Sequence, residues 1–172
     1  ASTFMAHLLA LSPGQQAHDA NRLLERIVEP YPDAPRGCVL DSGVRRAHPL
    51  LAPFLEADRC LTINAAWNAT DHHGHGTGMA GVALYENLAP LLAGIDPVQV
   101  THRLESVTVL PPAVPGVAQP LPGTSVRDAV RLIERTARAE RIYSLSMSVP
   151  RERSDGRPSR LSTTIDQLAF GR

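Results

Sequence analysis

Three histidines, one aspartate and four glycines lie close together in the stretch Asp71-His72-His73-Gly74-His75-Gly76-Thr77-Gly78-Met79-Ala80-Gly81. Packing of a hydrophobic core does not explain so many polar and glycine residues in one short segment. The unperturbed pKa of histidine lies near neutrality, so this side chain serves both as a general base and as a metal ligand. The stretch is therefore a candidate for acid–base catalysis or for metal binding.

A carboxylate that could act together with these histidines follows an earlier apolar run. The segment Arg36-Gly37-Cys38-Val39-Leu40 stops at Asp41-Ser42-Gly43, which is typical of a buried strand with a polar group at its carboxyl end. Sites of α/β sheets lie at that end. A carboxylate bonded to one imidazole nitrogen fixes the tautomer and leaves the other nitrogen free to take a proton. Asp41 and His75 are thus candidates for an orienting carboxylate and a general base.

The rest of the chain supplies the elements that would position this pair. Apolar spacing predicts an amphipathic helix over 17–29, a buried helix that begins near His75, a helix from 125 to 137 capped by Thr124 or Ser125, and a last helix capped by Ser162. Strands are predicted at 36–40, 60–63, 102–110 and 142–149. The prolines between Pro111 and Pro122 predict an extended connection there. The alternation of strand, helix and strand predicts a parallel sheet.

Composition excludes several other classes of function. Seventeen basic and seventeen acidic residues cancel, which argues against a nucleic-acid or anionic-membrane partner. The two cysteines, Cys38 and Cys60, form no disulfide framework and no C-x-x-C pair. The apolar run from Phe4 to Leu11 is too short to span a bilayer and reads poorly as a signal peptide, which favours the cytoplasm and leaves export open. No cofactor is predicted.

Three motifs resemble segments of the subtilisin-like serine proteases, in the order found in that family. The first is Asp41-Ser42-Gly43-Val44 followed by His48-Pro49 and Leu51, which resembles the segment around the catalytic aspartate. The second is Gly74-His75-Gly76-Thr77 followed by Met79-Ala80-Gly81, which resembles the catalytic-histidine segment, with Asp71 where the family often has an acidic residue. The third is Ser144-Leu145-Ser146, which resembles the strand that lies beside bound substrate.

The resemblance implies an α/β fold with a doubly wound, mostly parallel sheet flanked by helices. It implies peptide-bond hydrolysis through an acyl-enzyme, with Asp41 as orienting carboxylate and His75 as general base and acid. A polypeptide substrate would lie extended along Ser144, Leu145 and Ser146. Residues 36–172 would form the N-terminal half of a peptidase domain, and residues 1–35 a helical extension ahead of it.

The family's serine nucleophile and its oxyanion asparagine cannot be assigned. Gly123-Thr124-Ser125 resembles the family's nucleophile motif. However, Val126-Arg127-Asp128 follows Ser125 where the family has small residues, and Ser125 precedes the substrate-like strand, whereas the family's serine follows that strand. The asparagines all precede that strand as well: Asn21, Asn64, Asn68 and Asn87. We therefore expect a truncated domain that is inactive alone. The strand edge that truncation leaves open would contact the missing half of the domain or the same edge of a second copy of the chain.

Two alternatives from other classes remain open. A metal-binding module could use Asp71, His72, His73 and His75, since zinc accepts both residue types. That interpretation leaves Gly76-Thr77 and Met79-Ala80-Gly81 unexplained. A catalytically dead subtilisin-like domain that serves as a binding scaffold is the other alternative. On the protease interpretation, His72 and His73 are loop residues and no metal ligand is assigned.

Overall fold

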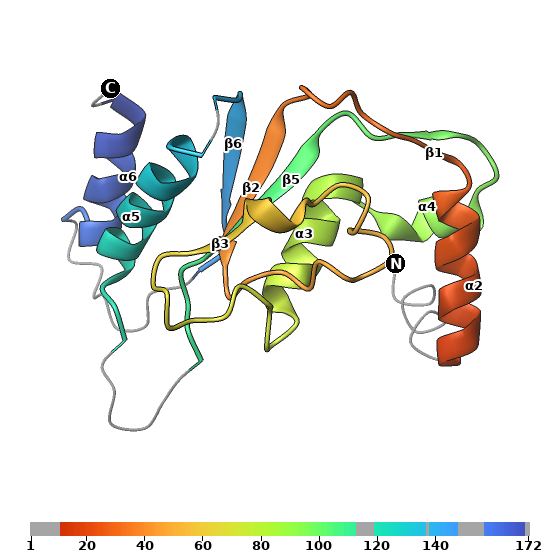
Figure 1. Ribbon diagram of the computed structural model, residues 1–172, viewed down its shortest axis with the longest axis horizontal. Helices are drawn as coiled ribbons and strands as arrows, with labels where there is room; N and C mark the ends of the chain where they lie inside the picture. Colours follow the sequence, from red (N-terminus) through yellow and green to blue (C-terminus); the bar gives the residue numbers. More distant parts are fainter. Residues whose placement is uncertain (1–10, 113–118, 137, 148–156, 171–172) are drawn as a thin grey trace.

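The computed structural model describes residues 11–112, 119–136, 138–147 and 157–170 (Figure 1). Nearly all of the apolar run from Phe4, the middle of the proline-rich connection and the end of the strand predicted to reach Val149 lie outside these residues. Within them no helix is both long enough and apolar enough to cross a membrane.

A parallel sheet of four strands forms the centre of the structure. Its strands are β2 (Arg36–Asp41), β3 (Cys60–Thr62), β5 (Arg103–Thr108) and β6 (Arg141–Leu145), in the spatial order β3-β5-β2-β6. All three neighbouring pairs are parallel, as the alternation of elements predicted. Two shorter strands, β1 (Ile27–Val28) and β4 (Val98–Gln99), pair with each other apart from this sheet.

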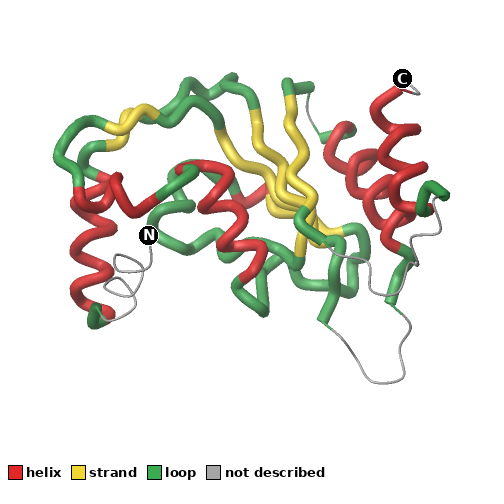
Figure 2. Tube along the Cα trace, turned by 180° about the vertical axis from the view of Figure 1, so that it is seen from behind, coloured by secondary structure: helices red, strands yellow, loops and turns green. Residues whose placement is uncertain are grey.

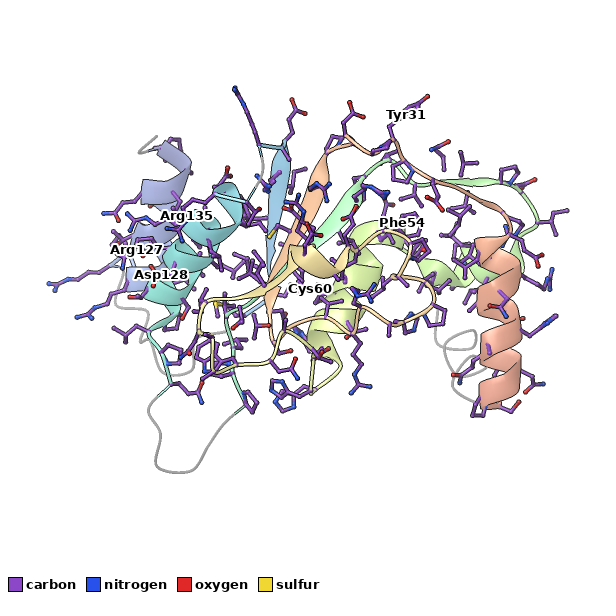
Figure 3. The ribbon with its side chains drawn as sticks, in the orientation of Figure 1. Tyr31, Phe54, Cys60, Arg127, Asp128 and Arg135 are labelled. Carbon is purple, nitrogen blue, oxygen red and sulfur yellow. The ribbon has the colours of Figure 1, made fainter. Side chains whose placement is uncertain are left out.

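Helices cover both faces of the sheet. Helix α3 (His75–Tyr85) lies on one face, and α5 (Pro122–Glu134) and α6 (Arg160–Phe170) lie together on the other (Figures 1 and 2). Strand β2 alternates between them: Val39 packs in the core on the α3 side, whereas Cys38 and Leu40 pack in the core on the α5 side. Phe54, labelled in Figure 3, packs in the core on the α3 side and contacts Tyr85 edge-on, with ring centroids 6.3 Å apart. The doubly wound α/β fold is confirmed.

The strand order reverses direction at β2. From β2 the chain passes through the short helix η1 (Ala57–Arg59) to β3, and then through α3 and α4 (Leu88–Ala93) to β5 beside β2. It next crosses β2 through α5 and adds β6 on the far side. Reversal points of this kind leave a crevice at the carboxyl ends of the strands, where ligands of open α/β sheets bind. Asp41 is the last residue of β2 and lies at this point.

The first described helix differs from its predicted range. Helix α2 runs over Pro13–Leu24 and is capped by Ser12, whose hydroxyl accepts from Gln15 N while the Gln15 side chain accepts from Ser12 N. The prediction of a helix over 17–29 was wrong at both ends, since α2 begins at Pro13 and ends at Leu24. Strand β1 follows instead, and the Arg26 guanidinium donates to the carbonyls of Leu91 and Asp96. These long-range bonds compete successfully with helix propagation.

Both predicted caps of the later helices were also wrong. Helix α5 begins at Pro122 with Leu121 at the N-cap, and Ser125 lies inside the helix with 1% of its surface exposed. Proline suits the first turn because its ring fixes φ and the missing N–H has no helical partner there. At α6 the Ser159 hydroxyl accepts from Ser162 N, so the capping side chain is Ser159.

Candidate active site

Asp41 ends the central strand with its side chain enclosed by protein. The residue is 1% exposed, and its Oδ1 accepts a 2.7 Å hydrogen bond from the backbone N–H of Ser42. The Asp41 backbone carbonyl accepts from Val109 N at 2.8 Å, which ties the end of β2 to the chain that leaves β5. The carboxylate therefore has a fixed position at the reversal point of the sheet.

His75 is the first residue of α3 and faces this carboxylate. Its Nδ1 lies 2.9 Å from Oδ2 and 3.0 Å from Oδ1 of Asp41. Because a carboxylate oxygen only accepts, this geometry requires the ring proton on Nδ1 and leaves Nε2 as the acceptor. The His75 side chain is 55% exposed, so its free edge is open to solvent. Within the described part of the chain, Asp41 is the only side chain that His75 bonds to.

The pair borders a hollow of about 480 Å³ at the carboxyl ends of β2 and β6, which we call the active-site hollow. Its described lining residues come from five segments of the chain: Asp41, Ser42, His73, His75, Leu110, Pro111, Gln119, Ser146 and Met147. A polar pair at one wall and apolar side chains at another could hold an extended ligand beside an acid–base group.

Two glycines allow the close approach of α3 to the end of β2. A Cβ at Gly76 would overlap the carbonyl oxygen of Gly43 and would lie 3.2 Å from the Asp41 Cβ. Gly43 itself has a φ of +98° and lies against the backbone of Ala69. A positive φ of this size is costly for residues with a side chain. Gly43, two residues after Asp41, and Gly76, directly after His75, are thus required by geometry.

Asp71 joins the loops that carry the pair. Its Oδ1 accepts from the Ser42 hydroxyl at 2.9 Å and from the N–H groups of His73 and Gly74 at 3.0 and 2.9 Å. Its Oδ2 accepts from Thr77 N at 2.8 Å and from the Thr77 hydroxyl at 2.7 Å. Burial alone would raise the pKa of Asp71, but the bonds from Thr77, His73 and Ser42 outweigh it and hold the pKa below its ordinary range.

The three predicted substrate-strand residues differ in their positions. Ser144 and Leu145 lie within β6, paired with Val39 and Leu40 of β2. Leu145 also lines a separate apolar cavity between the sheet and helices α5 and α6. Only Ser146 of the three lines the active-site hollow, where Met147 follows it. The structure thus brings Asp41, His75 and Ser146 together.

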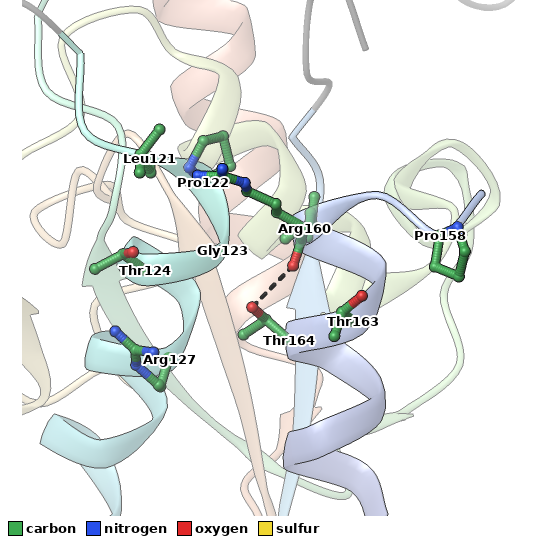
Figure 4. A pocket seen from close by; sticks show the side chains of 10 residues that line it. Leu121, Pro122, Gly123, Thr124, Arg127, Pro158, Arg160, Thr163 and Thr164 are labelled. Carbon is green, nitrogen blue, oxygen red and sulfur yellow. Dashed lines mark hydrogen bonds between the residues drawn. The ribbon is translucent and has the colours of Figure 1, made fainter. Parts of the chain in front are cut away.

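The rejected nucleophile motif has a packing explanation. A Cβ at Gly123 would lie 2.7 Å from Oγ1 of Thr164, whose hydroxyl donates to the Arg160 carbonyl, so glycine lets α5 and α6 approach (Figure 4). Ser125 is absent from the described lining of the active-site hollow. Arg127 lines a hollow between α5 and α6 (Figure 4), while Asp128 in α5 and Arg135 directly after it are exposed (Figure 3).

The structure does not bring the side chains of Asp71, His72, His73 and His75 together as metal ligands. Among the described residues, no group of three or more His, Cys, Asp or Glu side chains is placed to hold a metal ion. The rings of His72 and His73 lie 4.2 Å apart, while Asp71 is bonded to Ser42 and Thr77 and His75 to Asp41.

Several lining residues had no assigned role in the sequence analysis. Leu110 and Pro111 come shortly after β5, which ends at Thr108. Because the carboxyl ends of adjacent parallel strands meet at one edge, their position could have been inferred. His73 also reaches the hollow, although it was interpreted as a loop residue on the protease interpretation and as a metal ligand on the alternative one. Gln119 lies within the proline-rich segment between Pro111 and Pro122, and no local pattern pointed to it.

Comparisons with known proteins bear on the family. The sequence model of the subtilase family, a family of serine peptidases, matches residues 38–172. A search of curated proteins found no match, and a search of solved structures found none either. The family match covers both motifs that carry Asp41 and His75. It also covers β2 from Cys38 and the whole of β3, β5 and β6. The chain belongs to the subtilase family.

Proposed function

We propose that this chain supplies the acid–base half of a serine endopeptidase site. Asp41 accepts a hydrogen bond from the Nδ1–H of His75 and stays ionised, so that Nε2 takes the proton of an attacking serine and later donates it to the leaving amine. Asp41 also stabilises the imidazolium that forms in between. The observation that carries the proposal is the hydrogen bond between Asp41 and Nδ1 of His75 at the edge of an open hollow.

The substrate in this proposal is a polypeptide in extended conformation. Strand β6 is an edge strand of the described sheet, and its end leads through Ser146 into the active-site hollow. A peptide can add to such an edge through main-chain hydrogen bonds. The predicted contact residues are Ser144, Leu145 and Ser146. No metal and no cofactor takes part in the steps proposed here.

The serine nucleophile and the oxyanion donor come, in this proposal, from another polypeptide segment. The only Gly-Thr-Ser motif lies in α5, and the Ser42 hydroxyl in the hollow is bonded to Asp71. Removing the nucleophile from subtilisin costs about as much as removing the whole triad, roughly 10⁶-fold in kcat. We therefore expect the chain alone to hydrolyse no peptide.

His75→Ala tests the role of the histidine in a form of the protein that contains the nucleophile segment. We expect kcat for peptide hydrolysis to fall by roughly 10⁶-fold, with no change in bound metal. His72→Ala is the matched control, since His72 does not line the hollow, and should retain activity. Loss of bound zinc in His75→Ala, with proteolysis intact, would show that the cluster is a metal site instead.

The same proposal places a partner on the open side of β6. Ile142, Ile165 and Phe170 are 78%, 42% and 87% exposed. Ile165 also lines the apolar cavity that Leu145 lines. Exposed apolar surface beside an unpaired strand edge favours association. We expect sedimentation to show self-association of the chain at high concentration. A compact monomer that binds no hydrophobic dye would contradict this part of the proposal.

A further inference from the structure

Asp71 is a buried carboxylate whose described bonds all go to segments next to Asp41 and His75. It is 2% exposed and accepts five hydrogen bonds, none of them from a residue beyond those two segments. It does not line the active-site hollow within the described residues, so a ligand there would not touch it. Its chemistry must therefore act through its neighbours.

On the Asp41 side, the connection runs through Ser42. The Ser42 N–H donates to Asp41 Oδ1 at 2.7 Å, while its hydroxyl donates to Asp71 Oδ1 at 2.9 Å. One residue thus bonds to both carboxylates. A shift of Asp71 would move Ser42 and remove the donor that orients the Asp41 carboxylate.

On the His75 side, Asp71 holds the backbone before and after the histidine. It accepts from the N–H groups of His73 and Gly74, which precede His75, and from Thr77 N, which follows it. The Thr77 hydroxyl also donates to Asp71 and accepts from Arg45 N at 3.0 Å, which adds a second link to the loop after β2. Hydrogen bonds to an ionised group are roughly twice as strong as neutral ones, so the arrangement is stiff.

From these contacts we infer that Asp71 is a positioning residue, which sets the distance between Asp41 and Nδ1 of His75 and thereby the tautomer of the histidine. The inference rests on the proposed function, because the Nδ1–H tautomer is useful only if Nε2 is the proton acceptor. An acid–base pair has to be held within about 0.5 Å of its working geometry by such supporting contacts.

Asp71→Asn removes the charge and keeps the shape. An amide has one acceptor oxygen and a donor NH₂ group, whereas each Asp71 oxygen now faces two or three donors. Either orientation of the amide therefore points a donor at other donors. We expect the loop or the first turn of α3 to shift, and His75 to lose its fixed Nδ1–H tautomer.

The measurement is the tautomer of the neutral His75 ring in the ¹⁵N-labelled full chain, read from long-range ¹H–¹⁵N spectra at about pH 9, above the ordinary titration range of free histidine. His75→Gln identifies the signal among the seven histidines. We expect one tautomer in the wild type and a mixture in Asp71→Asn. Asp58→Asn is the matched control, since the Asp58 side chain is 75% exposed, and should behave as wild type. A folded Asp71→Asn with the wild-type tautomer would overturn the inference.

Thr77 provides a second test if Asp71→Asn does not fold. Thr77→Val removes the hydroxyl with little change of shape, and Thr77→Ser keeps it. Loss of the single tautomer in the valine variant, with retention in the serine variant, supports the inference, and retention in both overturns it. Asp41→Ala separates the two proposals, because alanine leaves no side-chain acceptor for the Nδ1–H of His75. An unchanged tautomer there would refute the Asp41–His75 pair itself, whatever Asp71 does.

Discussion

Gly76→Ala is expected to destabilise the protein by about 3 kcal/mol or more and to separate His75 from Asp41. The added Cβ would overlap the Gly43 carbonyl and press on the Asp41 side chain, which lies 3.2 Å away at its Cβ. Both obstacles are rigid, because one is backbone and the other is buried and hydrogen-bonded. Urea unfolding followed by circular dichroism measures the change in the free energy of unfolding.

Gly78→Ala is the control in the same helix. Nothing lies within 4 Å of a Cβ at Gly78, so alanine meets open space there. Alanine is the better helix former, and this variant should gain up to about 1 kcal/mol. If the free energy of unfolding is the same in Gly76→Ala and Gly78→Ala, whether both fall or neither does, α3 does not approach β2 as described.

Glu105→Gln is expected to cost about 3 to 5 kcal/mol of stability, the scale for breaking a buried ion pair. Glu105 lies in β5 with no exposed surface, and Arg141 of β6 donates to it at 2.6 and 3.2 Å. Arg36 and Arg59 lie 3.7 and 3.6 Å from the same carboxylate. The neutral amide would leave these guanidinium groups without the charge that joins three elements at the amino ends of the strands.

Glu134→Gln serves as the comparison for Glu105→Gln. Glu134 also contacts Arg141, at 3.5 Å, but its side chain is 37% exposed. Water screens such a pair, so the loss should be at most about 1 kcal/mol. Thermal melting of both variants checks the difference. If Glu105→Gln melts at the wild-type temperature, the carboxylate is not the electrostatic centre of this cluster.

The parts of the fold that could be predicted are those with local signals. The apolar run that stops at Asp41 and the glycine-rich start of the helix at His75 both describe elements that the structure contains. Their mutual position followed from the rule that sites lie at the carboxyl ends of parallel strands, together with the family resemblance. The cap of α2 was missed although Ser12 and Gln15 have the spacing of a capping box, so this local signal could have corrected the predicted start of the helix.

The parts that could not be predicted depend on contacts between distant residues. Nothing near Glu105 in the sequence shows that a strand glutamate is fully buried, because the arginines that surround it come from β2, η1 and β6. The end of α2 at Leu24 depends likewise on bonds from Arg26 to carbonyls near α4. Asp71 could be noticed as an acidic neighbour of His75, but its bond to Ser42 spans two loops.

The position of the ring proton on His75 tests the central claim most directly. If Asp41 orients the histidine as a general base, the neutral ring carries its proton on Nδ1, bonded to the Asp41 carboxylate, and Nε2 is unprotonated. Long-range ¹H–¹⁵N spectra of the wild-type chain should show that single tautomer. A neutral ring protonated on Nε2, with Nδ1 free, would contradict the account.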